Sequence, residues 1–163
     1  APDFLKAPEP LIQKNFARIM SLKDGTKKMS KSDPSDLSRI NLTDGKDEIV
    51  NKIKKAKTDL LTLPSDDKNL SERPEVENLL GIYSNLSNQS LNNSINEFSG
   101  KNFSEFKEKL ADLVVGKITP ISNEINKLQK DNNFIDSVLR DGAKKASEIA
   151  SKKVEEMKKI IGF

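Results

Sequence analysis

The feature that most restricts the fold of this chain is a helical repeat of apolar residues from about residue 44 to the C-terminal end. Apolar residues recur there at positions i, i+3, i+4 and i+7, the pattern of a helix with one buried face. Five segments carry the pattern: 46–57, 74–86, 91–98, 104–128 and 135–161. Such helices bury their apolar faces against each other, so we expect a helical bundle with all five stripes in its core.

Single residues mark the ends of these helices. Asp44 and Ser90 have side chains that cap a helix N-terminus, and Pro74 suits a first helical turn. Pro120 falls inside the 104–128 segment, where we expect it to kink or break the helix.

The first 43 residues have a different character. Phe16–Leu22 is a short, mainly apolar run that ends in a charged turn, which is typical of a buried strand. Residues 23–35 are polar and contain Gly25 and Pro34, so they predict an exposed loop. The predicted fold class is therefore mainly α, with a strand-like segment and a loop before a helical bundle.

Composition excludes several classes of protein. The chain has no histidine and no cysteine, so disulfides and thiolate catalysis are excluded and no metal site is expected. No run of 18 apolar residues could span a membrane and no signal peptide is visible, so we expect a cytoplasmic protein with no membrane partner. The net charge of +3 is too small to indicate nucleic acid as a partner by itself.

The candidate site is the lysine- and serine-rich part of the loop. Lys27, Lys28 and Lys31 supply three cations, and Ser30 and Ser32 add hydroxyls beside them. Ammonium, hydroxyl and backbone N–H groups are donors that bind phosphate oxygens. When a triphosphate reacts at its α-phosphate, mobile lysines can neutralise the charge that grows on the departing pyrophosphate. The alternative is a solvated loop without a ligand, because most loops of this composition bind nothing.

Two helices carry lysines on their polar faces. Four lysines of the 46–57 helix and six of the last helix make these faces basic: Lys52, Lys54, Lys55, Lys57, Lys144, Lys145, Lys152, Lys153, Lys158 and Lys159. Such lysines can contact RNA phosphates without reading sequence. Acidic residues alternate with them and favour helix-supporting ion pairs on a solvated face instead.

The string KMSKS at 28–32 is the second signature motif of class I aminoacyl-tRNA synthetases. The longer stretch 17–33, ARIMSLKDGTKKMSKSD, resembles the bacterial-type tryptophanyl-tRNA synthetases. The resemblance extends over about residues 9–163 and includes NLLGIYS at 78–84 and Asp141-Gly142-Ala143. The motif alone indicates class I only, whereas the spacing from RIMSL to KMSKSD favours the tryptophanyl type.

The resemblance implies a role for each matched residue of the loop. Ile19 would contact the adenine of ATP, and Met29 would lie near the nucleotide base. Four residues would hold the ATP phosphates: Lys28, Ser30, Lys31 and Ser32. Three of them would be catalytic: Lys28, Ser30 and Lys31. The family usually has proline where Gly25 stands, and a glycine is expected to loosen the base of the loop.

The resemblance also divides the chain into two domains. Residues 1–43 would be the end of a Rossmann-like catalytic domain with the KMSKS loop, and residues 44–163 the α-helical anticodon-binding domain. The family needs a histidine-bearing motif and an amino acid pocket that this chain lacks. We therefore expect the C-terminal part of an enzyme, inactive alone. The parent would be a homodimer that uses ATP with Mg²⁺, tryptophan and tRNA, without a tightly bound cofactor.

Two alternatives remain from the sequence. One is the corresponding part of a tyrosyl-type synthetase, which shares the class I motif. The other is a non-enzymatic helical bundle that binds RNA or protein and has no affinity for ATP.

Overall fold

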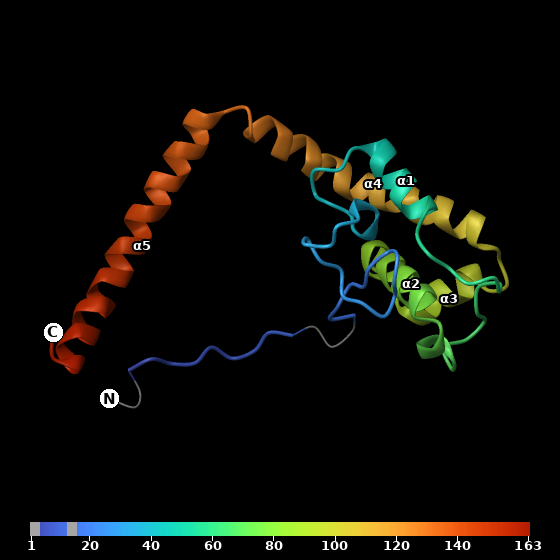
Figure 1. Ribbon diagram of the computed structural model, residues 1–163, viewed down its shortest axis with the longest axis horizontal. Helices are drawn as coiled ribbons and strands as arrows, with labels where there is room; N and C mark the ends of the chain where they lie inside the picture. Colours follow the sequence, from blue (N-terminus) through green and yellow to red (C-terminus); the bar gives the residue numbers. More distant parts are fainter. Residues whose placement is uncertain (1–3, 13–15) are drawn as a thin grey trace. The chain divides into compact units, whose positions relative to one another are not determined.

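The computed structural model describes residues 4–12 and 16–163, which fall into two compact units. One unit is Ile12–Glu124, and the other combines Ala1–Leu11 with Ile125–Phe163. The helices, in chain order (Figure 1), are the 3₁₀ helix η1 (Asp36–Ser38), α1 (Lys46–Lys54), the 3₁₀ helix η2 (Leu70–Glu72), α2 (Pro74–Ser87), α3 (Leu91–Phe98), α4 (Phe103–Leu128) and α5 (Asn132–Ile161). The prediction of a mainly helical chain is confirmed.

Several predicted helix boundaries are correct. Pro74 occupies the first turn of α2, where its missing N–H has no intrahelical acceptor to lose. Ser90 caps α3, because its Oγ accepts a hydrogen bond from Asn93 N–H at 3.2 Å. At Pro120, however, α4 continues without a break. One missing hydrogen bond is a small loss for a helix whose neighbouring turns pack on a core.

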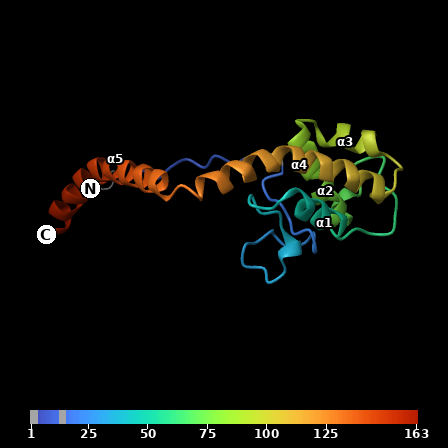
Figure 2. The ribbon, with the colours of Figure 1, turned by 90° about the horizontal axis from the view of Figure 1, so that it is seen from above.

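The larger unit has a core built from one face each of α1, α2, α3 and α4. Figures 1 and 2 show these four helices side by side. Tyr83, Phe98 and Phe106 form an edge-to-face aromatic cluster at its centre, with ring centroids 4.9 Å apart for two of the three pairs. Burial of each large apolar side chain contributes about 1.5–3 kcal/mol, so the predicted stripes of these helices do stabilise the bundle.

Asp44 was expected to cap α1 and does not. The helix begins one residue later than that expectation requires, with Gly45 as its N-cap and the Glu48 carboxylate accepting the Gly45 N–H at 2.7 Å. The Asp44 carboxylate is instead buried and accepts hydrogen bonds from Asn41 and Lys52. The Asp44 carboxylate binds the Lys52 ammonium rather than the backbone N–H groups of the helix, because a hydrogen bond between two charged groups is stronger.

The predicted buried strand at Phe16–Leu22 is wrong in part. Within the described residues, the segment makes a single antiparallel bridge, between Met20 and Lys28, and forms no regular strand. Ser21 and Leu22 are buried, but residues 17–19 are exposed. A fully buried strand lies inside a sheet, with a strand at each edge and both faces covered. Here the one β partner among the described residues is the loop that follows.

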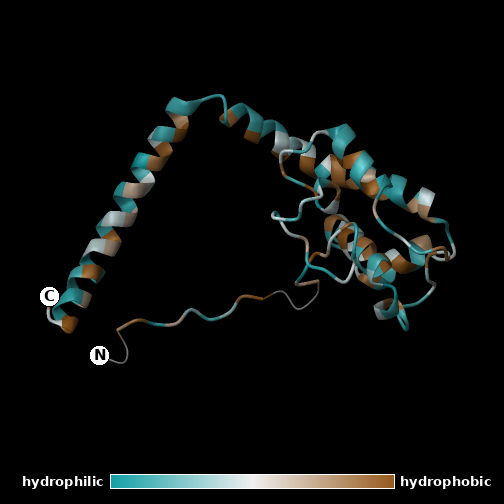
Figure 3. Ribbon diagram, in the orientation of Figure 1, coloured by the Kyte–Doolittle hydropathy of each residue, from teal (hydrophilic) through white to brown (hydrophobic). Residues whose placement is uncertain are grey.

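The last helix, α5, belongs to the smaller unit and has no buried residue. Figure 3 shows apolar positions spaced along it, as the sequence predicted. The expectation that this stripe is part of a core is wrong for this structure, because Val138, Leu139 and Ile149 are each at least half exposed. Periodicity identifies a helical face but not the surface that covers it.

Candidate functional site

The four residues expected to hold phosphates lie together on the surface. Lys28, Ser30, Lys31 and Ser32 are all exposed and follow one another in a single loop of the larger unit. The Oγ atoms of Ser30 and Ser32 are 2.9 Å apart, and Ser32 N–H donates to Ser30 Oγ at 3.3 Å. Among the described residues, neither Lys28 nor Lys31 forms an ion pair. The loop therefore offers two free cations and a pair of hydroxyls to an anionic ligand.

The two residues expected near the nucleotide base are brought together by their backbones. Met29 N–H donates to the carbonyl of Ile19 at 3.0 Å. The Ile19 side chain is 47% exposed, so it is available for contact with a planar base. The Met29 side chain is half-buried and packs against the helical core. Met29 is thus the apolar anchor of a loop that is otherwise polar.

The loop leaves the Ile19–Ser21 segment through a tight turn centred on Asp24. Ser21 N–H donates to the carbonyl of Lys27 at 2.8 Å, which closes the turn. The Asp24 carboxylate accepts hydrogen bonds from the Thr26 hydroxyl at 2.6 Å and from the Thr26 N–H at 3.1 Å. These bonds, with the ammonium of Lys27, lower the pKa of Asp24 to about 2. The turn keeps its charged, hydrogen-bonded form at neutral pH.

Gly25 fixes this turn to the helical bundle. The glycine is buried, and a Cβ atom at this position would lie 2.5 Å from both Glu75 N and Pro74 C in the first turn of α2. Lys57 pairs with the Glu75 carboxylate at 2.7 Å, and this bond raises the pKa of Lys57 and lowers that of Glu75. The expectation that a glycine loosens the base of the loop is corrected here. Its missing side chain lets α2 approach and hold the turn.

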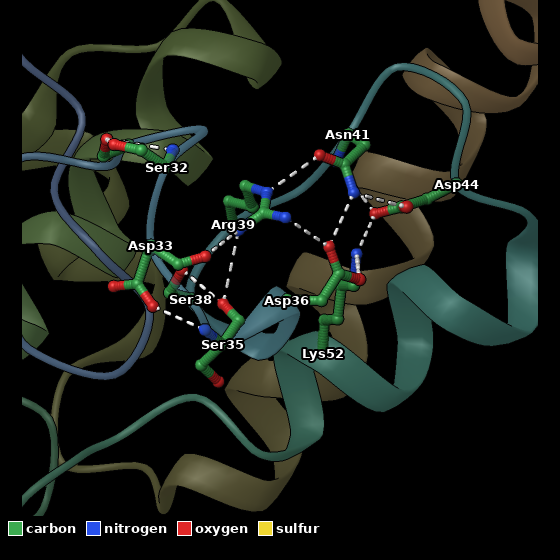
Figure 4. A network of polar contacts seen from close by, with 10 residues as sticks. Ser32, Asp33, Ser35, Asp36, Ser38, Arg39, Asn41, Asp44 and Lys52 are labelled. Atoms are coloured by element: carbon green, nitrogen blue, oxygen red, sulfur yellow. Dashed lines mark hydrogen bonds and ion pairs between the residues drawn. The ribbon is translucent and has the colours of Figure 1, made fainter.

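The other end of the loop is tied to α1 by a network of charges (Figure 4). Lys52 is 3% exposed, and its Nζ lies 2.6 Å from carboxylate oxygens of both Asp36 and Asp44. The Asn41 amide donates to both carboxylates as well. Arg39 pairs with Asp36 at 2.9 Å and donates to the carbonyl of Asp33, the residue after the motif, at 2.9 Å.

The charges of this network stabilise one another. Burial acts to lower the pKa of Lys52, but its hydrogen bonds to Asp36 and Asp44 outweigh burial, and the pKa is raised. The same Lys52 hydrogen bond lowers the pKa of Asp36. This network could not be predicted from the sequence, which assigned Lys52 to the polar face of its helix, either solvated or in contact with RNA phosphates. That assignment is wrong, because a buried and doubly paired ammonium cannot reach a phosphate.

The remaining lysines of that surface stay exposed, at positions 54, 55 and 57, as do those of α5. No group of acidic side chains in the described residues could hold a metal ion. The described helices include none with the length and apolar content that crossing a bilayer requires.

Known proteins resemble the chain over almost its whole length. The model of the family "tRNA synthetases class I (W and Y)" matches residues 2–136. A tryptophan–tRNA ligase from Mesorhizobium japonicum is 52% identical over 160 residues, covering 98% of this chain and 45% of the relative. One from Rickettsia felis is 49% identical over 161 residues, covering 99% and 48%. The solved tryptophanyl-tRNA synthetase of Mycoplasma pneumoniae superposes with a TM-score of 0.74 at 27% identity, covering 93% and 45%. The chain thus spans about half the length of these relatives.

Proposed function

Because the chain belongs to the class I tRNA synthetases of the tryptophan and tyrosine group, we propose that it is the C-terminal part of a tryptophan–tRNA ligase. The family that the KMSKS motif indicated is the right one. Tryptophan is preferred over tyrosine because the relatives that are 49–53% identical carry the name tryptophan–tRNA ligase. The parent enzyme would activate tryptophan with ATP, bound as its Mg²⁺ complex, and then transfer it to tRNA in the cytoplasm.

The observation that carries the proposal is the pair of free, exposed lysines around Ser30, in a loop held at both ends. In adenylate formation the tryptophan carboxylate attacks the α-phosphate, the bond to the β-phosphate oxygen breaks, and pyrophosphate leaves with the extra negative charge. Lys28 and Lys31 would neutralise that charge as it develops, and the Ser30 and Ser32 hydroxyls would donate to phosphate oxygens. Interactions that strengthen only in the transition state raise the rate rather than the affinity for ATP.

The rest of the chain would serve tRNA. Residues 44–163, with the exposed lysines of their helices, would form the anticodon-binding domain. Residues 1–43 would complete a catalytic domain supplied by the remainder of the parent. Without that remainder the chain has neither an amino acid pocket nor a second group for the transition state, so it would be inactive alone. The parent would be a homodimer.

The test is amino acid-dependent exchange of ³²P-pyrophosphate into ATP. The full-length parent is expected to exchange with tryptophan and not with tyrosine, and the 163-residue chain alone is expected not to exchange with either. Exchange driven by tyrosine would assign the chain to the tyrosyl type. A parent without any exchange and without affinity for ATP would instead support a non-enzymatic helical bundle.

A further inference from the structure

Asn78 lies on α2, far from the KMSKS loop in sequence, yet it binds the backbone just before that loop. Met20 N–H donates to Asn78 Oδ1 at 2.9 Å, and Asn78 Nδ2 donates to the Met20 carbonyl at 2.9 Å. Asn78 is 2% exposed and is among the largest fully buried side chains of the bundle. One carboxamide therefore satisfies both backbone groups of a single residue.

The direction of these bonds follows from the pairing of Met20 with Lys28. The two residues form an antiparallel bridge, and the hydrogen bonds lie on either side of it, from Ser21 N–H to Lys27 and from Met29 N–H to Ile19. In such a non-hydrogen-bonded pair, the N–H and C=O of Met20 point away from Lys28. They point toward α2, where the Asn78 amide takes the place of the peptide group of a neighbouring strand.

The chain of contacts thus runs from a rigid helix to the first lysine of the motif. Asn78 fixes Met20, and Met20 is paired with Lys28. Gly25, packed on the first turn of the same helix, fixes the turn between them. Met20 and Lys28 cannot shift along α2 unless both hydrogen bonds between the Asn78 carboxamide and the Met20 backbone break.

We propose that Asn78 is a positioning residue for adenylate formation, which sets the place of Lys28 and Lys31 against the ATP phosphates through the backbone of Met20. The proposal rests on the proposed function of the loop. An asparagine carboxamide supplies a donor and an acceptor at this spacing at neutral pH, which an ionised aspartate does not. An alanine at position 78 leaves the Met20 N–H and carbonyl without partners. Residues 20–28 can then move until water hydrogen-bonds to both groups.

Amide hydrogen exchange on the 163-residue chain tests the positioning without reference to catalysis. Asn78→Ala is expected to speed exchange at Ser21 and Met29 by at least about tenfold while Phe106, in the core, keeps its protection. Asn85→Ala is the matched control, because Asn85 is an exposed asparagine of the same helix whose side chain, among the described residues, bonds only to the Gly81 carbonyl. Unchanged exchange at Ser21 and Met29 in Asn78→Ala overturns the proposal.

Kinetics of the full-length parent test the consequence for chemistry. Asn78→Ala is expected to lower kcat of tryptophan-dependent pyrophosphate exchange about 10²-fold, with KM for tryptophan unchanged, because a displaced lysine loses its alignment with the leaving group. Transfer of tryptophan from preformed adenylate to tRNA involves no pyrophosphate and should keep its rate. Asn85→Ala should leave both steps unchanged.

Asn78→Asp separates positioning from a merely structural role. The new carboxylate accepts from Met20 N–H but cannot donate to the Met20 carbonyl, whereas the protonated acid can do both. The rate of tryptophan-dependent pyrophosphate exchange by the Asn78→Asp parent, relative to wild type, should therefore rise as the pH is lowered from 8 to 6. The proposal is contradicted if Asn78→Asp slows adenylate formation and transfer to tRNA equally. It is also contradicted if pyrophosphate exchange by this variant does not recover at low pH. A wild-type parent that lacks tryptophan-dependent exchange contradicts the proposed function instead, and leaves the hydrogen-exchange result to decide the positioning.

Discussion

Replacing Lys52 by methionine is expected to destabilise the larger unit by about 3 kcal/mol at pH 7. Methionine keeps the apolar stem that α1 packs on the core but removes the ammonium between Asp36 and Asp44. The Asp44 side chain is 6% exposed and would be left as a buried carboxylate whose remaining partner, among the described residues, is Asn41. Removing one member of a buried ion pair costs about 3–5 kcal/mol. The lower end of this range applies because the Asp36 side chain is 56% exposed, so water can replace Lys52 as its hydrogen-bond partner.

The deficit of Lys52→Met should also depend on pH. The substitution removes the hydrogen bond that lowers the pKa of Asp36, so the deficit should be full at pH 7 and should shrink as the pH falls below the usual carboxyl pKa. The pKa of Asp36 is lowered by its Lys52 hydrogen bond, so the stability that Asp36 contributes is present above the usual carboxyl pKa and is lost only as the pH falls through the lowered value.

Thermal unfolding followed by circular dichroism at 222 nm measures both effects. A loss of about 3 kcal/mol corresponds to a fall in Tm of roughly 10–15 °C for a unit of this size. The control is Lys54→Met on the same helix, because Lys54 is exposed and its replacement should change Tm by about 2 °C or less. A Tm for Lys52→Met equal to that of wild type at pH 7, or a deficit that is as large at pH 2.5 as at pH 7, would refute the reasoning.

Two further predictions concern the turn before the motif. Gly25→Ala should destabilise the unit by about 1–3 kcal/mol in urea unfolding, because its Cβ would overlap the backbone of Pro74 and Glu75. The matched change Gly116→Ala, in the interior of α4, places its Cβ with no atom within 4 Å apart from its chain neighbours and the backbone of its own helix, and should instead stabilise by about 0.5–1 kcal/mol. A loss at both sites would argue against a special contact at Gly25. Thr26→Val should raise the pKa of Asp24 from about 2 toward 3.8, as followed by the ¹³C carboxyl shift in an NMR titration, and an unmoved midpoint would show that the hydroxyl is not the main cause.

Sequence reasoning located the helices of the bundle because their cores are built from local repeats. Val76, Leu79 and Leu80 of α2 follow helical spacing, and all three are buried. The same reasoning found α5 as a helix but misjudged its burial, because an apolar stripe does not reveal its partner. The loop motif was identified from contiguous residues, and the structure gathers them on one exposed surface.

The contacts that hold the loop could not be predicted, because they join residues distant in sequence. Lys52 pairs with Asp36, and Asn78 bonds to Met20 across 58 positions. A charged or polar residue on a helix is most often solvated, so neither stood out from its neighbours. Gly25 was judged by its conformational freedom, whereas its importance lies in the close approach of α2, which only the folded chain reveals.

The central claim is that Lys28 and Lys31 neutralise the pyrophosphate that leaves during adenylate formation. The direct measurement is the single-turnover rate of tryptophanyl-adenylate formation by the full-length parent carrying Lys28→Ala and Lys31→Ala together. Loss of one such donor typically lowers the rate about 10²–10³-fold, so we expect the double variant to lose at least about 10³-fold while Lys109→Ala, an exposed lysine on α4, loses nothing. Adenylate formation by the double variant at the wild-type rate would contradict the claim.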